Sequence, residues 1–262
     1  MIPTRVLSLA GSCNFRDCGG YTTLQGARVR WGRLYRSGVL QGLSTAATAS
    51  VEALGLRAVC DLRRNAERAR YPNPAFSAHV RRFEWDTGQE ASPLRDQDLA
   101  GEAAATRARE RMLRMYERMP FELRPRFAGV FEALAHAGDG ATIVHCMAGK
   151  DRTGVAIALV LSALDVPRNA ILADYALTNE AVNLRVQITQ RKAAGAGLAA
   201  SAEPLLSLSE AALDAVLAAH PEYLLASLEA IEARHGSVHA YLRAELAVPE
   251  STLARLRETM LE

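Results

Sequence analysis

The 262-residue sequence predicts a single α/β domain, residues 1–262, with a mostly parallel central sheet flanked by helices. Apolar runs of strand length alternate with helical patterns through the first two-thirds of the chain, which is typical of parallel strands joined by helices. The last third has helical spacing of apolar residues throughout. Hydrophobic residues make up 49% of the sequence, enough for a substantial core, and no repeat divides the chain.

Each predicted strand is a short apolar run next to turn residues. A turn-rich opening with paired glycines, residues 11–21, comes first. The predicted strands follow over residues 29–37 (one strand or two), 56–63, 79–85 and 142–144.

Capping residues and apolar stripes mark the predicted helices. Ser44 is the expected N-cap of a helix that ends at Leu54. A stripe of methionines predicts an arginine-rich helix over residues 107–119, and Pro120 is expected to open the next helix, which runs to residue 137. Further helices are predicted over residues 155–161, 168–177, 180–192, 209–219, 221–234, 238–246 and 249–261, with a mobile loop over 87–105 and a flexible joint at 193–197.

The charge, the hydropathy and the cysteine content argue against nucleic-acid binding, membrane insertion and a zinc site. The net charge of +2 gives no reason to expect nucleic acid or an acidic membrane as a partner. No apolar stretch is long enough for stable membrane insertion, and the N-terminus lacks a cleavable signal pattern. We therefore expect a cytoplasmic protein, or one secreted without a cleaved signal peptide. The four cysteines show no zinc spacing, so no metal or cofactor is expected.

The most informative stretch is His145 to Gly154, with the sequence HCMAGKDRTG. A predicted strand precedes it and a buried apolar helix follows. A loop that leads into a helix N-terminus presents unpaired N–H groups and the positive end of the helix dipole, which together bind anions. Here Cys146 lies at the start of that loop and Arg152 at its end. The pattern indicates a phosphate-binding loop with its own nucleophile.

The residue types in this loop suit phosphoryl transfer. The helix N-terminus and Arg152 would lower the pKa of the Cys146 thiol and so favour the nucleophilic thiolate. Arg152 offers a planar two-pronged donor that matches phosphate oxygens, and Lys150 adds a second cation at the mouth. The expected phosphate-binding backbone comprises Met147, Ala148, Gly149, Lys150, Asp151 and Arg152.

A proton donor for the leaving group lies in the same loop. Asp151 is the candidate general acid, and it would later activate the water that cleaves the cysteinyl phosphate. Thr153 is expected to donate its hydroxyl to the sulfur of Cys146. His145 is expected to fix the loop through backbone hydrogen bonds.

Asp61 and Arg63 end a predicted central strand, at the edge where such sheets bind ligands. Two roles stay open for them: contact with the loop or substrate, or a buried ion pair that joins sheet to loop. Cys60, their neighbour, could protect Cys146 through a reversible disulfide.

The loop, together with Asn14-Phe15-Arg16-Asp17-x-Gly19-Gly20, resembles the bacterial tyrosine-phosphatase-like family of the cysteine-based protein tyrosine phosphatase superfamily. Further matching segments cover nearly the whole chain; they lie at 32–37, 61–63, 173–179, 222–224 and 236–242.

The resemblance implies a phosphatase that acts on phosphotyrosine and often on phosphoinositides, with Cys146 as nucleophile, Asp151 as acid and Arg152 as phosphate clamp. It also implies a helical lid, here about residues 174–219, for which Gly195 and Gly197 would suit a hinge.

Two departures from related phosphatases stand out. Lipid-directed relatives carry a lysine directly after the cysteine, where this chain has Met147. Many tyrosine phosphatases take their acid from a Trp-Pro-Asp loop; here Trp85 is followed directly by Asp86, so Asp86 stays an alternative acid.

The sequence therefore predicts a phosphatase that hydrolyses phosphate monoesters through a phosphocysteine intermediate on Cys146. Its expected partner is a phosphorylated protein (on tyrosine, or on serine and threonine) or a phosphoinositide. The alternatives are a catalytically weak phosphate-recognition module and a rhodanese-like sulfur carrier, although the ending Arg152-Thr153-Gly154 argues against the latter. The oligomeric state stays open.

Overall fold

A computed structural model describes residues 4–86, 103–193 and 208–262. Its five-stranded sheet has the order β1-β2-β5-β3-β4. Four strands run parallel: β2 (Leu34–Ser37), β5 (Ala141–His145), β3 (Leu56–Asp61) and β4 (Arg81–Glu84). The edge strand β1 (Arg16–Asp17) is antiparallel to β2. The predicted α/β architecture with a mostly parallel sheet is confirmed.

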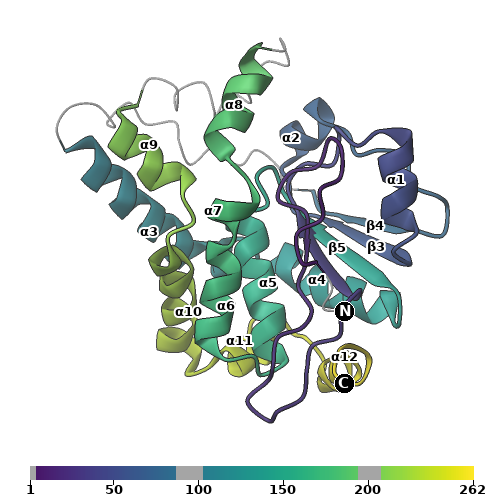
Figure 1. Ribbon diagram of the computed structural model, residues 1–262. Coiled ribbons are helices and arrows are strands. Elements are labelled where there is room, and N and C mark those ends of the chain that lie inside the picture. Colours follow the sequence, from purple (N-terminus) through teal and green to yellow (C-terminus); the bar gives the residue numbers. More distant parts are fainter. Residues whose placement is uncertain (1–3, 87–102, 194–207) are drawn as a thin grey trace.

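The two faces of the sheet bury different side chains because strand residues alternate in direction. On one face Val59 and Ile143 pack with Val51 of α1 (Thr45–Glu52). On the other, Cys60 and Val144 join the larger core, which is built with α4 (Arg124–Ala137), α5 (Asp151–Ala163) and the C-terminal helices. Figure 1 shows α1 on one side of the sheet and α4 and α5 on the other. The central strand β5 is fully buried, so the loop that follows it starts from a fixed point.

The other predicted helices are present in the predicted order, and Ser44 and Ser209 cap α1 and α9 as expected. Their bounds are α3 (Ala104–Glu122), α6 (Arg168–Ala176), α7 (Thr178–Ala181), α8 (Leu184–Ala193), α9 (Glu210–Leu217), α10 (Pro221–His235), α11 (Val238–Ala244) and α12 (Glu250–Met260). Helix α2 (Asn65–Arg70) was not predicted.

The predicted helix boundary at Pro120 is wrong. Pro120 lies inside α3, and α4 begins only at Arg124. A proline has no N–H, so the carbonyl of Tyr116, four residues earlier, loses its helical partner. Ser227 of α10 supplies a replacement, because its hydroxyl donates to the Tyr116 carbonyl oxygen at 2.6 Å. A contact distant in sequence thus lets the helix continue past the proline.

The predicted single helix over residues 180–192 is two helices. It is interrupted at Val182, whose backbone is extended, between α7 and α8. Gly195, Gly197 and most of the predicted loop over 87–105 lie outside the described residues. Within the described ranges, none of the helices is long and apolar enough to cross a membrane.

Candidate active site

The loop between β5 and α5 is held by its carbonyl groups, which point away from its centre. The backbone N–H of Val39 donates to the Met147 carbonyl at 3.0 Å. The side chain of Asn14 donates to the carbonyls of Ala148, at 3.2 Å, and Gly149, at 2.9 Å. A trans peptide bond directs its N–H opposite to its C=O. The N–H groups of the residues that follow these carbonyls, residues 148–150, therefore face the centre of the loop.

Gly149 brings the loop against the end of β2. Its φ angle is +66°, a left-handed conformation that favours glycine. A Cβ atom placed there would lie 2.6 Å from the backbone of Ser37 and Gly38. Only a residue without a side chain fits this approach. The N–H groups at the start of α5 face the same space, which gives the loop the geometry of an anion site.

A buried ion cluster of three charged residues, Arg16, Arg36 and Asp174, holds the loop in place. Arg36 donates to the Gly149 carbonyl at 2.8 Å and to Asp174 of α6 at 2.6 Å. Arg16 also lies against Asp174, with 3.6 Å between Nε and Oδ1, and donates to the side chain of Asn14. Burial alone would raise the pKa of Asp174, but the charges of Arg36 and Arg16 outweigh it and lower the pKa. The cluster gives Asn14 and Arg16, part of the N-terminal motif, a structural role.

Arg152 is oriented by Glu67, a residue of α2. Its Nη1 donates to Oε2 at 2.6 Å and its Nη2 to Oε1 at 3.0 Å, while Nη1 also donates to the Leu62 carbonyl at 3.2 Å. Burial opposes the charge of Glu67, yet Arg152 holds the pKa of that carboxyl well below its usual range. A guanidinium has five N–H donors, so two of those on Arg152 have no partner among the described residues.

Asp61 and Arg63 form the buried ion pair that was one of the two predicted alternatives. Arg63 Nη2 lies 2.6 Å from Asp61 Oδ2, and Arg63 Nε lies 2.8 Å from Oδ1. Asn73 donates to Asp61 Oδ2 at 2.9 Å and its Nδ2 lies 3.3 Å from Nε2 of His145. The pair and Asn73 therefore connect the end of β3 to the residue before Cys146.

His145 is a poor proton carrier in this setting. It is fully buried, and that burial lowers its pKa to about 4 despite the nearby charge of Asp61. The imidazole is consequently neutral at physiological pH. Its Nε2 lies 3.3 Å from the side-chain amide of Asn73, and its Nδ1 has no hydrogen-bond partner within the described residues, so the expected fixing of the loop through backbone hydrogen bonds stays a prediction.

Asp151, the predicted acid, lies in the first turn of α5 and is partly exposed. Tyr116 of α3 donates to its Oδ1 at 2.7 Å. Asp86, the alternative acid, is exposed and accepts a hydrogen bond from the Asn65 side chain at 2.5 Å. Of the two carboxylates, Asp151 is the one joined to the loop through its backbone.

Lys150 does not present its ammonium group at the open mouth. The side chain is buried, and Nζ donates to the carbonyls of Val216, at 2.5 Å, and Ala218, at 3.3 Å. These carbonyls lie at the C-terminal end of α9, where a cation is favoured by the helix dipole. Lys150 thus joins the loop to the segment after α9, while its backbone N–H keeps its place in the loop.

Two further predictions concern contacts with Cys146, which is itself buried. The hydroxyl of Thr153 is buried and makes no hydrogen bond within the described residues, so the expected bond to the sulfur is not formed. Cys60 is a free thiol on β3 whose pKa is raised by burial. Its disulfide with Cys146 stays a prediction.

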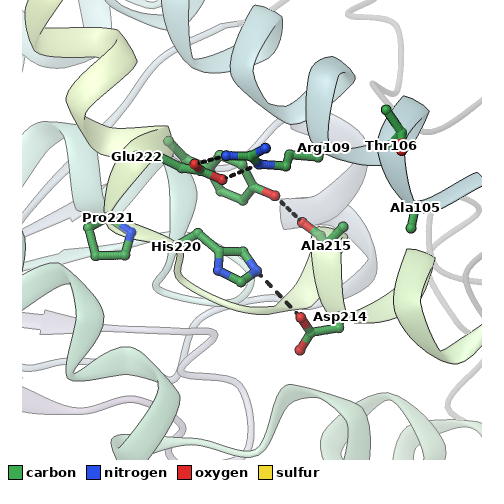
Figure 2. A pocket seen from close by; sticks show the side chains of 9 residues that line it. Ala105, Thr106, Arg109, Asp214, Ala215, His220, Pro221 and Glu222 are labelled. Carbon is green, nitrogen blue, oxygen red and sulfur yellow. Dashed lines mark hydrogen bonds and ion pairs between the residues drawn. The ribbon is translucent and has the colours of Figure 1, made fainter.

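A cavity of about 680 Å³ lies beside this site, between α3, α9 and α10. Figure 2 shows Arg109 paired with Glu222 along one wall and His220 directed at Asp214 along another. The ring of Tyr223, which also lines the cavity, packs against Tyr116 with 5.7 Å between ring centroids. Only the ring of Tyr223 therefore separates the cavity from Tyr116, the residue that contacts Asp151.

Comparisons of the sequence with known proteins identify the family. The sequence model of the tyrosine phosphatase family fits residues 7–262. The chain belongs to the tyrosine phosphatase family. It is 36% identical to an inferred tyrosine-protein phosphatase of Cupriavidus necator, over 92% of this chain and 84% of that protein.

A second member of the family is similar over nearly its full length. The triple specificity protein phosphatase PtpB of Mycobacterium tuberculosis is 30% identical, over 98% of this chain and 99% of PtpB. A tyrosine-protein phosphatase of Nostoc commune is 31% identical over 55% of this chain. The predicted family is confirmed, and with it a hydrolase whose substrate is phosphorylated.

Sequence reasoning missed Glu67, Tyr116 and Asp174 as parts of this site. Glu67 had a local signal, because Arg64 and Glu67 have the spacing of a capping box at the start of α2. That pattern predicts a helix start and says nothing of Arg152. Asp174 lies in the matching segment 173–179, which indicates the family but not the ion pair with Arg36. Tyr116 had no such signal, since only the packing of α3 on α5 brings it to the loop.

Proposed function

We propose that this chain is a cysteine-dependent phosphatase that hydrolyses phosphate monoesters through a phosphocysteine intermediate on Cys146. The observation that supports this most is the loop itself, with its N–H groups directed inward and Cys146 at its base. Arg152, oriented by Glu67, adds two donors beside it. Donors that are fixed before the reaction stabilise charge on the equatorial phosphoryl oxygens without rearrangement.

The reaction has two steps. The Cys146 thiolate attacks phosphorus and forms an S–P bond as the P–O bond to the leaving group breaks, and Asp151 gives its proton to the departing oxygen. Water then attacks the phosphocysteine, Asp151 takes a proton from that water, and the S–P bond breaks to release phosphate and the thiolate. Asp151 therefore returns to its starting state in each cycle.

Phosphotyrosine is the proposed principal substrate, since family membership supports it directly. Phosphoserine, phosphothreonine and phosphoinositides are further candidates because PtpB is named for triple specificity. The ammonium group of Lys150 donates to the carbonyls of Val216 and Ala218, so it does not add its charge at the mouth of the pocket. This argues against a strongly basic pocket for highly phosphorylated lipids.

The proposed lid is about residues 174–219, of which the structure describes 174–193 and 208–219. The side-chain amide of Asn179 exchanges two hydrogen bonds with the backbone of Ala219, at 2.7 and 3.2 Å, and so closes the base of this segment. Asp174, in contrast, is buried in the ion cluster with Arg36. A lid that moves would therefore begin after Asp174 and turn about the Asn179–Ala219 contact.

The function is tested by turnover of para-nitrophenyl phosphate, a phosphotyrosine peptide, phosphoserine and phosphothreonine peptides and a phosphoinositide panel. We expect release of phosphate by the intact protein and none by Cys146→Ser, which keeps the fold and binds phosphate. Substantial turnover by Cys146→Ser would contradict the proposal. A thiosulfate assay on the same samples separates a sulfur carrier from a phosphatase.

A further inference from the structure

Two buried tyrosine hydroxyls extend from Asp151 into the core. The hydroxyl of Tyr116 lies 2.7 Å from Asp151 Oδ1, and the hydroxyl of Tyr175 lies 2.6 Å from that of Tyr116. Tyr116 comes from α3 and Tyr175 from α6, and both side chains are completely buried. Neither residue belongs to the loop motif.

The direction of these hydrogen bonds follows from the groups involved. A phenol has one O–H, and an ionised carboxylate can only accept. Tyr116 therefore donates a hydrogen bond to Asp151, and Tyr175 donates a hydrogen bond to the hydroxyl oxygen of Tyr116. Burial, together with the charge of Asp151, raises the pKa of Tyr116 well above its ordinary value, so Tyr116 stays protonated. Tyr116 is thus a permanent donor to this carboxyl group.

Both tyrosine rings are held by packing. Tyr116 packs edge-on against Tyr175, with 6.1 Å between the ring centroids, and its carbonyl is fixed by Ser227. Tyr175 lies directly on α5 at Gly154, where an added Cβ would be 2.8 Å from the ring. The last glycine of the HCMAGKDRTG motif therefore makes room for Tyr175.

The donors to Asp151 are on one side of its carboxyl group. Tyr116 Oη and Lys150 Nζ, at 2.7 and 3.3 Å, both face Oδ1. We propose that Tyr116, oriented by Tyr175, is a positioning residue that occupies Oδ1 and leaves Oδ2 to transfer the proton. Oδ1 accepts from Tyr116 whether Asp151 is protonated or ionised, so the arrangement serves both steps of the reaction. This inference depends on the proposed role of Asp151.

The test uses a series of aryl phosphates whose leaving groups span a range of pKa. The quantity measured is kcat/KM, because it reports P–O cleavage even where hydrolysis of the intermediate limits kcat. Tyr116→Phe keeps the ring and removes the hydroxyl. We expect kcat/KM to fall about tenfold or more for the poorest leaving groups, by loss of part of the general acid effect. For the best leaving groups we expect little change.

Tyr175→Phe should show the same pattern with a smaller loss, because Tyr116 remains. Tyr241→Phe is the matched control: its ring is also fully buried, and its hydroxyl donates at 2.6 Å to the carbonyl of Pro120 instead of to Asp151. It should leave the dependence on the leaving group unchanged. Thermal unfolding of all three variants measures the structural cost separately.

The outcomes distinguish this inference from the function on which it rests. If Asp151→Asn is sensitive to the leaving group and Tyr116→Phe is not, the positioning role is wrong and the acid role stands. A loss in Tyr116→Phe that is equal for all leaving groups also contradicts it. If Asp151→Asn shows no such sensitivity, or Cys146→Ser turns over substrate, the proposed function itself fails.

Discussion

Glu67 and Arg152 face each other through two parallel hydrogen bonds, Nη1 to Oε2 at 2.6 Å and Nη2 to Oε1 at 3.0 Å. The pair joins α2 to the first turn of α5, across 85 positions of sequence. It fixes the plane of the guanidinium while leaving donors for a ligand. The orientation of Arg152, the proposed phosphate clamp, is therefore set by a residue outside the loop.

Glu67→Gln should weaken catalysis while Arg152 is still present. The change removes the negative charge and one acceptor, so the guanidinium is no longer held in one plane. We expect kcat/KM on a phosphotyrosine peptide to fall by about ten- to a hundredfold, since small displacements of a catalytic group carry costs of this size. Glu245→Gln, in the surface pair with Arg124, is the control. Equal activity of both variants would contradict the account.

Gly149→Ala should abolish most activity and destabilise the protein. The added methyl group would lie 2.6 Å from the backbone of Gly38 and the loop would have to move. Gly26→Ala is the control, because Gly26 also has positive φ, +87°, yet has nothing within 4 Å of an added Cβ. Both variants carry the cost of a left-handed alanine, on the order of 1 kcal/mol. Only Gly149→Ala should lose phosphatase activity, as measured with para-nitrophenyl phosphate.

Asp174→Asn should be among the most destabilising single substitutions in this chain. It leaves the buried charges of Arg16 and Arg36 without their shared counter-ion. Breaking such a buried pair costs about 3–5 kcal/mol in the free energy of unfolding. Chemical denaturation measures this loss, with Asp139→Asn, a largely exposed carboxylate, as the control. A loss no greater than that of the control would show that the cluster does not stabilise the fold.

Asp61 should stabilise the protein above pH 4 and cease to do so near pH 2. Burial would raise its pKa, but His145 and Arg63 lower the pKa to about 2. A carboxyl group whose pKa is lowered by folding stabilises the folded state above its unfolded pKa, about 3.9, and loses that effect as the pH falls through the folded value. The difference in free energy of unfolding between the intact protein and Asp61→Asn should therefore shrink from pH 5 to pH 2. A difference that stays constant would exclude this coupling.

The sheet, most helices and the loop after β5 were predictable because their signals are local. The apolar run before Cys146 and the apolar helix after Arg152 each have a period that a short window reveals. The N-caps at Ser44 and Ser209 depend on bonds within one turn. Pro120 was misplaced because the bond that makes a proline acceptable in α3 comes from Ser227, 111 positions away.

The support of the site was not predictable for the same reason. Glu67, Tyr116 and Asp174 contact the loop or its anchors from α2, α3 and α6, and nothing near them in sequence indicates this. For Lys150 the motif predicts the position of the backbone but not the direction of the side chain, which depends on carbonyls at the C-terminal end of α9. The ten consecutive residues from His145 to Gly154 predict an anion site with a cysteine. The orientation of their side chains depends on tertiary packing.

We propose that catalysis proceeds through a phosphocysteine at Cys146. Acid quenching of the protein during turnover of a radiolabelled phosphotyrosine substrate, followed by peptide mapping, tests it most directly. We expect label on the peptide that contains Cys146, more of it in Asp151→Asn because hydrolysis of the intermediate slows, and none in Cys146→Ser. Phosphate release without label on that peptide in both the intact protein and Asp151→Asn, or label on Cys146→Ser, would contradict it.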